Sequence, residues 1–460
     1  NWTSFFSGPA WRRIGEKWAL HLFTPEQPDL NWDNPSVRAE LADIVRFWHN
    51  KGVDGFRFDV VNLISKPVVF EDDTIGDGRR FYTDGPHVHE YLQELVKRGG
   101  IDGLMTVGEM SSTSIENCIR YSNPADHELA MTFSFHHLKV DYLNGDKWAL
   151  KEPDIGKLRE LLKSWQEQIT AGGGWNALFW NNHDQPRALN RFGDVQRYRA
   201  ESATMLATVI HLLRGTPYIY QGEEIGMIDP VYSSIDDYVD VEAHNAFKTL
   251  RARGLSEGEA LEVVRAKARD NSRVPMQWES GSGGERGAVG FGTAAPWLAP
   301  APSVDAATGA GISVADEERD GVILPYYREL IRLRGQYPVI SEGSYAPYAL
   351  DHERVFGYLR EHIAKGTRTR LLVLNNFFGD ETAVGVPAEF MPGEVLDALT
   401  DGEGSRVPAD ARSARVFLCN YKNSLGQVSG VSGPDPHEVE VTLRPYESLA
   451  LIVEEPIASS

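Results

Sequence analysis

The sequence predicts an α/β protein in which parallel βαβ units are followed by a separate segment of strands. Short apolar strands alternate with amphipathic helical stretches over residues 34–334, as expected when helices cover both faces of a parallel sheet. From about residue 338 only strand patterns remain. The 460 residues are enough for two packed bodies.

The first helix is predicted to begin at Asn34-Pro35, because an N-cap residue is followed by proline at the first helical position. Apolar residues then recur at helical spacing to about Asn50. The next strand lies within Gly52 to Val61, between turn residues. Further strands are predicted over residues 104–109, 129–135, 176–180 and 217–221, with helices over 85–97, 154–170 and 198–214.

The pattern changes after about residue 225. Residues 229–278 are charged and predicted to be helical, and residues 279–311, rich in Gly, Ala and Pro, predict a long loop. A last helix is predicted over residues 322–334, followed by strands over 354–359, 370–377, 416–420 and 439–453. We therefore divide the chain into residues 1–25, 26–337 and 338–460, the last an all-β sandwich domain that braces the α/β part.

Composition and charge exclude several classes of partner. Forty-six basic and 66 acidic residues give a net charge of −20, which disfavours binding to nucleic acid and to anionic membranes. No apolar run approaches the roughly 20 residues that span a bilayer. Cys118 and Cys419 are too few for a disulfide framework or a thiolate metal site, and they predict ordinary thiols in a reducing compartment. We expect no metal and no cofactor.

Three carboxylates, Asp59, Glu109 and Asp184, stand at the ends of predicted strands. Arg57 and Asp59 share one face of their strand, because side chains two residues apart point the same way. This pair alone is equally well explained as a structural ion pair, and a single strand-end carboxylate is more often a helix cap. Three at the carboxyl ends of different strands favour a catalytic site, because α/β barrels carry their active sites at that rim.

Glycoside hydrolysis requires such a set of carboxylates. Arg57 favours the ionised form of Asp59, which suits a nucleophile. Glu109 has no basic neighbour in the sequence, and burial near another carboxylate favours its protonated form, which suits a general acid. Asp184 and His183 remain to bind ring hydroxyls and to stabilise the distorted sugar.

Four segments resemble the α-amylase superfamily of retaining glycosidases, and within it the oligo-1,6-glucosidase branch: residues 55–62, 107–109, 182–184 and 269–278. The resemblance covers nearly the whole chain and implies a (β/α)8 TIM barrel with a C-terminal all-β domain. It implies Asp59 as nucleophile, Glu109 as acid/base and Asp184 as transition-state stabiliser. It also implies that Arg273 reaches toward the leaving-group sugar.

Within this branch the sequence is most similar to the trehalose-6-phosphate hydrolases, through residues 75–86, 108–113, 135–140 and 183–187. These enzymes form glucose and glucose 6-phosphate, so the resemblance implies a sugar-phosphate substrate and favours a cytoplasmic location. We expect a phosphate site made by Lys139 and Lys147, which follow a predicted barrel strand. A solvated surface charge is the commoner explanation for any single lysine, and Lys139 is the stronger candidate.

Arg79 and Arg80 are further candidates for the phosphate site, and Arg187 is a further candidate for substrate binding. Two alternatives to a trehalose-6-phosphate hydrolase stay open. One is a glucosidase acting on neutral isomaltose-type sugars. The other is a non-catalytic family member, which is disfavoured because such members usually lose a carboxylate and all three are present here.

The chain departs from the family pattern at its N-terminal side. The family barrel begins with three strands that this sequence lacks, so the chain carries about the last five strands of a partial barrel. Residues 1–25 resemble the tail of the family's inserted small domain. Because an incomplete barrel has open edges, we expect this chain alone to be inactive or unstable, and the missing N-terminal part of the barrel to complete the site.

Overall fold

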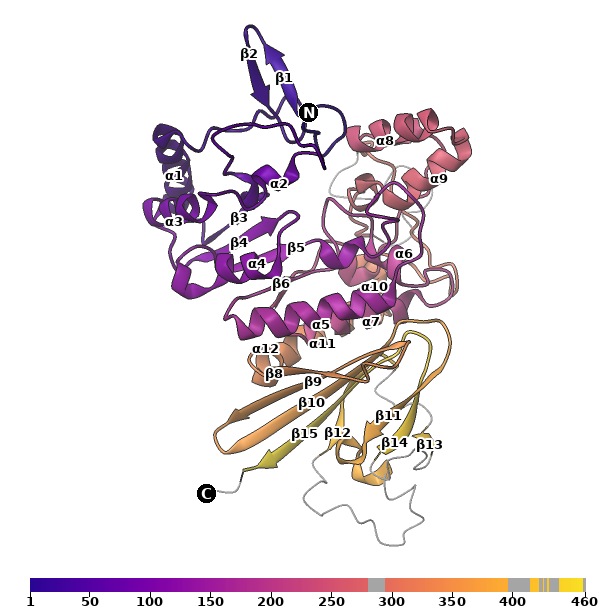
Figure 1. The fold of residues 1–460 in the computed structure, drawn as a ribbon. Helices are drawn as coiled ribbons and strands as arrows, with labels where there is room; N and C mark the ends of the chain where they lie inside the picture. The colour runs from indigo at the N-terminus through magenta and orange to yellow at the C-terminus, as the bar shows by residue number, and fades with distance from the viewer. Residues whose placement is uncertain (280–293, 396–413, 422–424, 426–427, 430–437, 458–460) are drawn as a thin grey trace. The chain divides into compact units, whose positions relative to one another are not determined.

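The computed structural model describes residues 1–279, 294–395, 414–421, 425, 428–429 and 438–457. The chain forms two compact units, each of which combines separate stretches of the sequence (Figure 1). The first unit contains Asn1–Lys139, Glu167–Leu178 and Asp240–Ala260. The second contains Val140–Gln166, Phe179–Val239 and Leu261–Ser460.

The first unit is built on a parallel sheet whose strands follow one another in sequence. The hydrogen-bonded order is β3-β4-β5, and an isolated parallel bridge between Thr132 and Asn176 lies at the start of β6. The strands are β3 (Gly55–Phe58), β4 (Met105–Met110), β5 (Met131–Ser134) and β6 (Ala177–Leu178). The unit also contains β1 (Trp11–Ile14), β2 (Lys17–Leu20), α1 (Pro35–Asn50), α2 (Arg79–Tyr82), α3 (Val88–Gly99), α4 (Ile115–Ser122) and α8 (Val241–Ala252). The predicted alternation of parallel strands and helices is confirmed here.

Helices α1 and α3 lie side by side next to β3 and β4 (Figure 1). Val45 of α1 and Leu95 of α3 belong to one apolar cluster, against which Phe56 and Phe58 of β3 pack. Because side chains alternate along a strand, Arg57 points away from this cluster. The covered face of the strand is therefore apolar and the opposite face carries the charge, as the sequence predicts.

The second unit contains a set of helices and the chain's antiparallel sheets. Before residue 344 it contains α6 (Ala188–Phe192), α7 (Arg199–His211), β7 (Thr216–Pro217), α10 (Val314–Arg319), α11 (Ile323–Gln336) and α12 (Pro338–Ser341). Two more helices, α5 (Ile155–Ala171) and α9 (Glu257–Lys267), have residues in both units. Helix α7 is buried on nearly every side and packs against α11, which explains its lack of a polar face.

Strands dominate the described residues from 344 onward. A five-stranded antiparallel sheet has the order β12-β15-β10-β9-β8, and a three-stranded sheet has the order β11-β14-β13. Buried residues of both sheets form one apolar cluster, so the sheets pack face to face. The strands are β8 (Ser344–Tyr348), β9 (Val355–Ala364), β10 (Thr367–Asn376), β11 (Thr382–Pro387), β12 (Arg415–Cys419), β13 (Val428–Ser429), β14 (Glu438–Leu443) and β15 (Ser448–Pro456).

Several predicted boundaries need correction. The single strand expected over residues 439–453 is two strands, because the chain turns at Pro445 and Tyr446, where φ is +53° at Tyr446. The strand expected over 217–221 is only Thr216–Pro217, and residues 229–240 lack the predicted α-helix. Residues 280–293 of the expected loop lie outside the described residues. The domain boundaries at residues 25 and 337 stay predictions.

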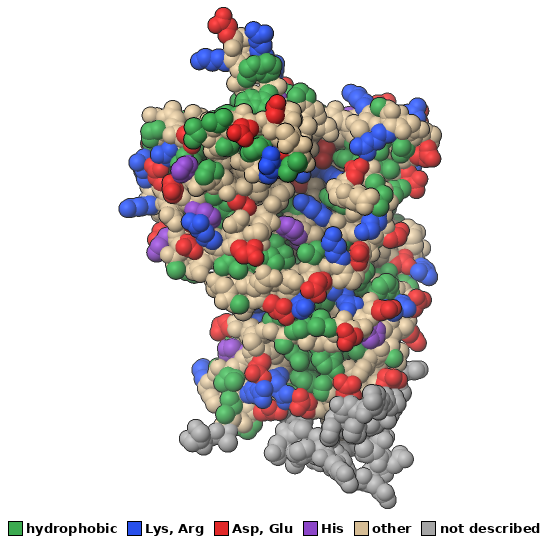
Figure 2. All heavy atoms as spheres, in the orientation of Figure 1, with side chains coloured by type: hydrophobic (Ala, Val, Ile, Leu, Met, Phe, Trp, Pro, Cys, Tyr) green, Lys and Arg blue, Asp and Glu red, His purple; other side chains and the backbone are tan. Residues whose placement is uncertain are grey.

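The molecular surface and the helices add two observations. Acidic and basic side chains are interspersed on the face drawn in Figure 2. No helix within the described ranges has both the length and the apolar character that a bilayer crossing requires. Cys118 and Cys419 are both free and buried.

Candidate active site

Two of the predicted carboxylates meet at the carboxyl ends of β3 and β4. The parallel register pairs Phe58 with Gly108, so Asp59 and Glu109 are the next residues on neighbouring strands. Arg57 Nη1 lies 2.5 Å from Asp59 Oδ1, and Arg57 Nη2 donates to Glu109 Oε2. One guanidinium therefore bridges the two carboxylates, with one charge-assisted hydrogen bond to each.

The two carboxylates differ in their exposure to solvent. The Asp59 side chain is 69% exposed, whereas that of Glu109 is 7% exposed. Gly108 allows this packing, because a Cβ at that position would lie 2.5 Å from Leu129 Cδ1 and from Met110 Cε. A larger residue immediately before Glu109 would therefore force the ends of the Leu129 and Met110 side chains to move.

Asp184 lies in the second unit, in a turn that follows Trp180, and it is surrounded by cations. Its Oδ1 accepts from Arg273 Nη2 at 2.8 Å and from Arg269 Nη1 at 3.1 Å. Its Oδ2 lies 3.2 Å from His183 Nε2. Arg273 also donates through Nε to the His183 carbonyl at 2.7 Å, so it fixes both the backbone and the carboxylate.

The environment of Asp184 keeps its carboxylate ionised. Burial would raise the pKa of Asp184, but His183, Arg269 and Arg273 outweigh burial and hold this pKa well below its usual range. The side chain is 24% exposed, so it remains reachable. An ionised, partly open carboxylate suits hydrogen bonding to sugar hydroxyls or stabilisation of positive charge.

Lys139 belongs to a cationic cluster in the first unit. It ends the short turn His136–Lys139 that follows β5. Burial lowers the pKa of Lys139, and the Arg79 cation lowers it further. Burial and the charge of Lys139 also lower the pKa of His136 to about 4. Cations brought together in this way are stabilised by a bound anion.

The other predicted binding residues have different surroundings. Arg80 pairs with the buried Asp73 at 2.9 Å. Lys147 lies in the second unit, with its ammonium 4.8 Å from the centre of the Trp148 ring. Arg187 is 2% exposed, and its Nη1 donates to the Gln221 carbonyl at 3.0 Å. The structure thus gives Arg187 a buried environment within the second unit, and it assigns Lys139 and Lys147 to different units.

Sequence reasoning missed residues that support the carboxylates. Arg269 lies within residues 269–278, one of the segments that resemble the family, but only Arg273 is predicted there as a binding residue. Asn62 and Asp84 also stand in recognised segments and connect the ends of β3 and β4. Their hydrogen-bonding side chains were visible in the sequence, but their partners lie up to 49 residues away, so spacing gave no indication of them.

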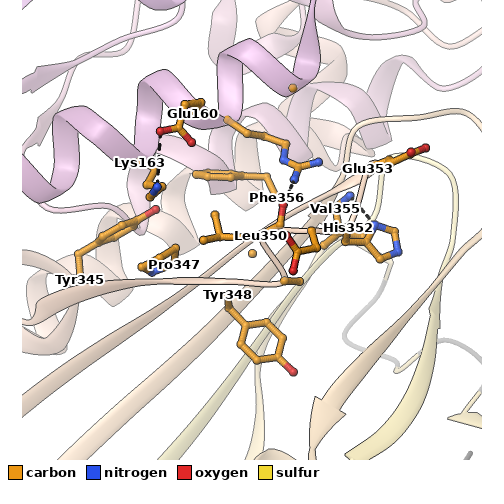
Figure 3. A pocket seen from close by; sticks show the side chains of 15 residues that line it. Glu160, Lys163, Tyr345, Pro347, Tyr348, Leu350, His352, Glu353, Val355 and Phe356 are labelled. Atoms are coloured by element: carbon orange, nitrogen blue, oxygen red, sulfur yellow. Dashed lines mark hydrogen bonds and ion pairs between the residues drawn. The ribbon is translucent and has the colours of Figure 1, made fainter. Parts of the chain in front are cut away.

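A cavity of about 390 Å³ lies elsewhere in the second unit, between α5 and the β8–β9 connection (Figure 3). Arg159 crosses it to donate to the Leu350 carbonyl at 2.9 Å. None of the site residues predicted from the sequence is among those that line it. In the described part of the chain, no three His, Cys, Asp or Glu side chains are grouped so as to hold a metal ion.

Comparisons with known proteins show the family to which the chain belongs. The family model of the alpha-amylase catalytic domain matches residues 1–343. The trehalose-6-phosphate hydrolase of Bacillus subtilis is 44% identical over 99% of this chain and 74% of its own length. The oligo-1,6-glucosidase of Bacillus cereus is 36% identical over 98% of this chain and 74% of its own length.

A solved structure shows the same relationship. The trehalose-6-phosphate hydrolase of Bacillus licheniformis superimposes with a TM-score of 0.81 at 43% identity, over 98% of this chain and 75% of its own. The chain thus spans about three quarters of the length of these relatives. The resemblance stated from the sequence is confirmed: the chain belongs to the alpha-amylase family.

Proposed function

We propose that the chain acts as a retaining glycoside hydrolase that cleaves trehalose 6-phosphate to glucose and glucose 6-phosphate. The observation that supports it best is the Arg57 guanidinium, which holds Asp59 and Glu109 together at neighbouring strand ends. Retaining glycosidases need two carboxyl groups close together across the scissile bond. The similarity to two trehalose-6-phosphate hydrolases supports the choice of substrate.

The proposed chemistry has two steps. In the first, an Asp59 oxygen attacks the anomeric carbon while Glu109 donates its proton to the glycosidic oxygen, so that glucose 6-phosphate leaves and a glucosyl ester forms. In the second, Glu109 removes a proton from water, which attacks the anomeric carbon and releases Asp59. The less exposed Glu109 suits the group that must carry a proton.

Asp184 is proposed as the stabiliser of the sugar in the transition state. Its ionised carboxylate can accept hydrogen bonds from ring hydroxyls and oppose the positive charge that develops at the anomeric carbon. Arg273 and Arg269 keep this carboxylate ionised and oriented. We propose His183 and Arg273 as binding residues, and a supporting role for Arg187 from its buried position.

The phosphate of the substrate is proposed to bind at Lys139, with Arg79 beside it. Burial lowers the pKa of Lys139, and the nearby Arg79 cation lowers it further. A phosphate dianion would offset both the burial and the repulsion. Lys147 is proposed as a second contact. Each arginine already has an acidic partner, Arg79 with Asp77 at 3.0 Å and Arg80 with Asp73 at 2.9 Å.

Replacement of Lys139 tests the substrate. For Lys139→Ala we expect kcat/KM on trehalose 6-phosphate to fall by about 10–100-fold, because a charge-assisted hydrogen bond of roughly 1.5–3 kcal/mol is lost. The rate on unphosphorylated trehalose or isomaltose should change little. Lys97→Ala, at an exposed lysine of α3, is the matched control. Equal losses on both sugars, or equal wild-type rates, would favour the neutral-sugar alternative.

The missing part of the barrel is proposed to complete the site. Strand β3 lies at the edge of the sheet β3-β4-β5. Nearby, α1 exposes Ile44, Phe47 and Trp48 by 49%, 53% and 51%. Open sheet edges and exposed apolar faces normally require cover. We propose that N-terminal barrel strands cover this edge and this face. We also propose that residues 338–460 form a separate domain that braces the α/β part. The enzyme is proposed to be cytoplasmic, because phosphorylated sugars arise inside the cell after uptake.

A further inference from the structure

We propose that Asn62 and Asp84 are positioning residues that set the separation of Asp59 and Glu109. The inference rests on the proposed function and adds two residues to which no role has been assigned. Asn62 follows Asp59 by three positions, and its contact Ser111 follows Glu109 by two. We call the hydrogen-bonded set of Asn62, Asp84 and Ser111 the clamp.

Asn62 joins the ends of the two strands. Its Oδ1 accepts from the Ser111 backbone N–H at 2.9 Å, and its Nδ2 donates to the Ser111 carbonyl at 2.8 Å. Asn62 is completely buried, so water does not compete for these bonds. Only a side chain with both an acceptor and a donor can make this pair of bonds. The segment after Glu109 is therefore tied directly to the segment after Asp59.

Asp84 anchors Asn62 from the other side. Its Oδ1 accepts from Asn62 Nδ2 at 3.1 Å and from Tyr121 Oη at 2.8 Å. Its Oδ2 accepts from Thr113 Oγ1 and Asn117 Nδ2, both at 2.8 Å. The Asp84 backbone N–H also donates to the Asn62 carbonyl at 2.9 Å. Four side-chain donors on one carboxylate fix its orientation and, through it, that of Asn62.

The backbone between Asp59 and Asn62 explains why a clamp is needed. Val60 adopts the left-handed conformation, with φ of 38° and ψ of 41°. For a β-branched residue this conformation is a true outlier, and it persists only where surrounding contacts impose it. Because Val60 is bonded directly to Asp59, relaxation of this strain would move the Asp59 carboxylate relative to Glu109.

The clamp thus makes a specific kinetic prediction. Neither Asn62 nor Asp84 is expected to touch the substrate, so binding should be largely retained when either is replaced. The chemical step should slow, because a displacement of about 1 Å can cost roughly 10²-fold in rate. The pH dependence of kcat should shift as well, since the spacing of two carboxylates affects the protonation of the acid.

Because residues 1–460 alone are expected to be inactive, the experiment uses them joined to the proposed N-terminal part of the barrel. The wild type is compared with Asn62→Ala and Asp84→Asn. We expect kcat on an aryl α-glucoside and on trehalose 6-phosphate to fall by about 10²-fold, with a much smaller change in KM and a displaced pH profile. The control is Asn123→Ala, because Asn123 likewise joins two segments of the first unit, donating to the Gly172 carbonyl and accepting from Ala125 N–H. It should lose stability with little loss of kcat.

The other possible results each contradict a stated part of the proposals. If kcat of Asn62→Ala stays within a few-fold of that of Asn123→Ala, or the pH profile does not move, the clamp does not position the carboxylates. If both clamp variants fail to fold while the control folds, the network serves the fold alone. A wild type that cleaves the aryl glucoside but not the sugar phosphate refutes the substrate and leaves the clamp testable. Inactivity on both refutes both proposals.

Discussion

The Arg57 guanidinium contacts two carboxylates that differ in their exposure to water. The Asp59 side chain is largely exposed, whereas that of Glu109 is largely buried. Burial disfavours the charged form of the Glu109 carboxyl group, and its ion pair with Arg57 favours that form. In the proposed mechanism, Glu109 loses its proton in the first step and regains one in the second. We propose that this difference in exposure suits Glu109 to the acid/base role and Asp59 to the role of nucleophile.

Glu109→Gln tests this assignment. Without a proton donor, the rate on a sugar leaving group should fall by about 10²–10⁴-fold. An aryl glucoside with an acidic phenol needs no proton to leave, so formation of the glucosyl ester should be nearly unaffected and the ester should accumulate. Rapid-quench kinetics with mass analysis of the protein would detect it. Equal fractional losses on both substrates would contradict a general-acid role.

Sequence predicted some of the site residues better than others, for physical reasons. Arg57 and Asp59 lie two positions apart, and strand alternation alone puts them on one face. Asn62 and Asp84 are joined by a hydrogen bond although they lie 22 positions apart in the sequence. No local periodicity encodes such a contact. Arg187 is buried, which its sequence position did not indicate, and its part in substrate binding stays a prediction.

At the scale of elements, the turn that carries Asp184 is held by a buried acid. Glu223 accepts from Asn181 Nδ2 at 2.7 Å and from Tyr327 Oη at 2.9 Å. Asn181 Oδ1 in turn accepts from the Ala188 N–H at 2.6 Å at the start of α6. The turn is therefore fixed at both ends, and the position of Asp184 depends on the packing of α11 as well as on its own neighbours.

Glu223 gives this unit a pH-dependent stability. Burial, its main influence, raises the pKa of Glu223 from 4.5 to about 7. The stabilising contribution of the protonated form is fully present below pH 4.5 and is lost as the pH rises through 7. Between pH 6 and 8 the wild type should lose about 1 kcal/mol more stability than Glu223→Gln, which cannot ionise. Calorimetric melting at both pH values measures this difference, and parallel losses would contradict it.

Element boundaries were predictable where a local cap marks them. Helix α1 begins at Pro35 as expected, because the Asn34 side chain accepts from the Ser36 N–H. The division of residues 439–453 into β14 and β15 was missed, although Pro445 marked the turn. Strands β6 and β7 are shorter than predicted. Apolar composition indicates that a segment is buried, but it does not fix how many of its residues pair with a neighbouring strand.

At the scale of the whole molecule, the chain shows the α/β and β segments predicted from its sequence and spans about three quarters of its relatives. Its division into two compact units was not predictable, because each unit combines stretches that are distant in sequence. The proposed further barrel strands would pack on the exposed apolar side chains of α1 and at the edge strand β3.

Adding such an N-terminal part is expected to stabilise the protein and to raise its turnover. Proteins with and without the additional residues should be compared by thermal melting and by kcat on an aryl α-glucoside. Amide hydrogen exchange should slow in α1 and β3 of the longer protein, because their exposed groups become covered. Equal melting temperatures and equal turnover would show that residues 1–460 need no such cover.

We propose that this family member cleaves trehalose 6-phosphate with retention through Asp59 and Glu109. Proton NMR of the reaction, with the enzyme that carries the proposed N-terminal part, shows which anomer of glucose forms. We expect α-glucose to appear first, in equal amount with glucose 6-phosphate, and to convert to the β-anomer only by mutarotation. Initial formation of β-glucose, or no cleavage of the phosphorylated sugar, would contradict it.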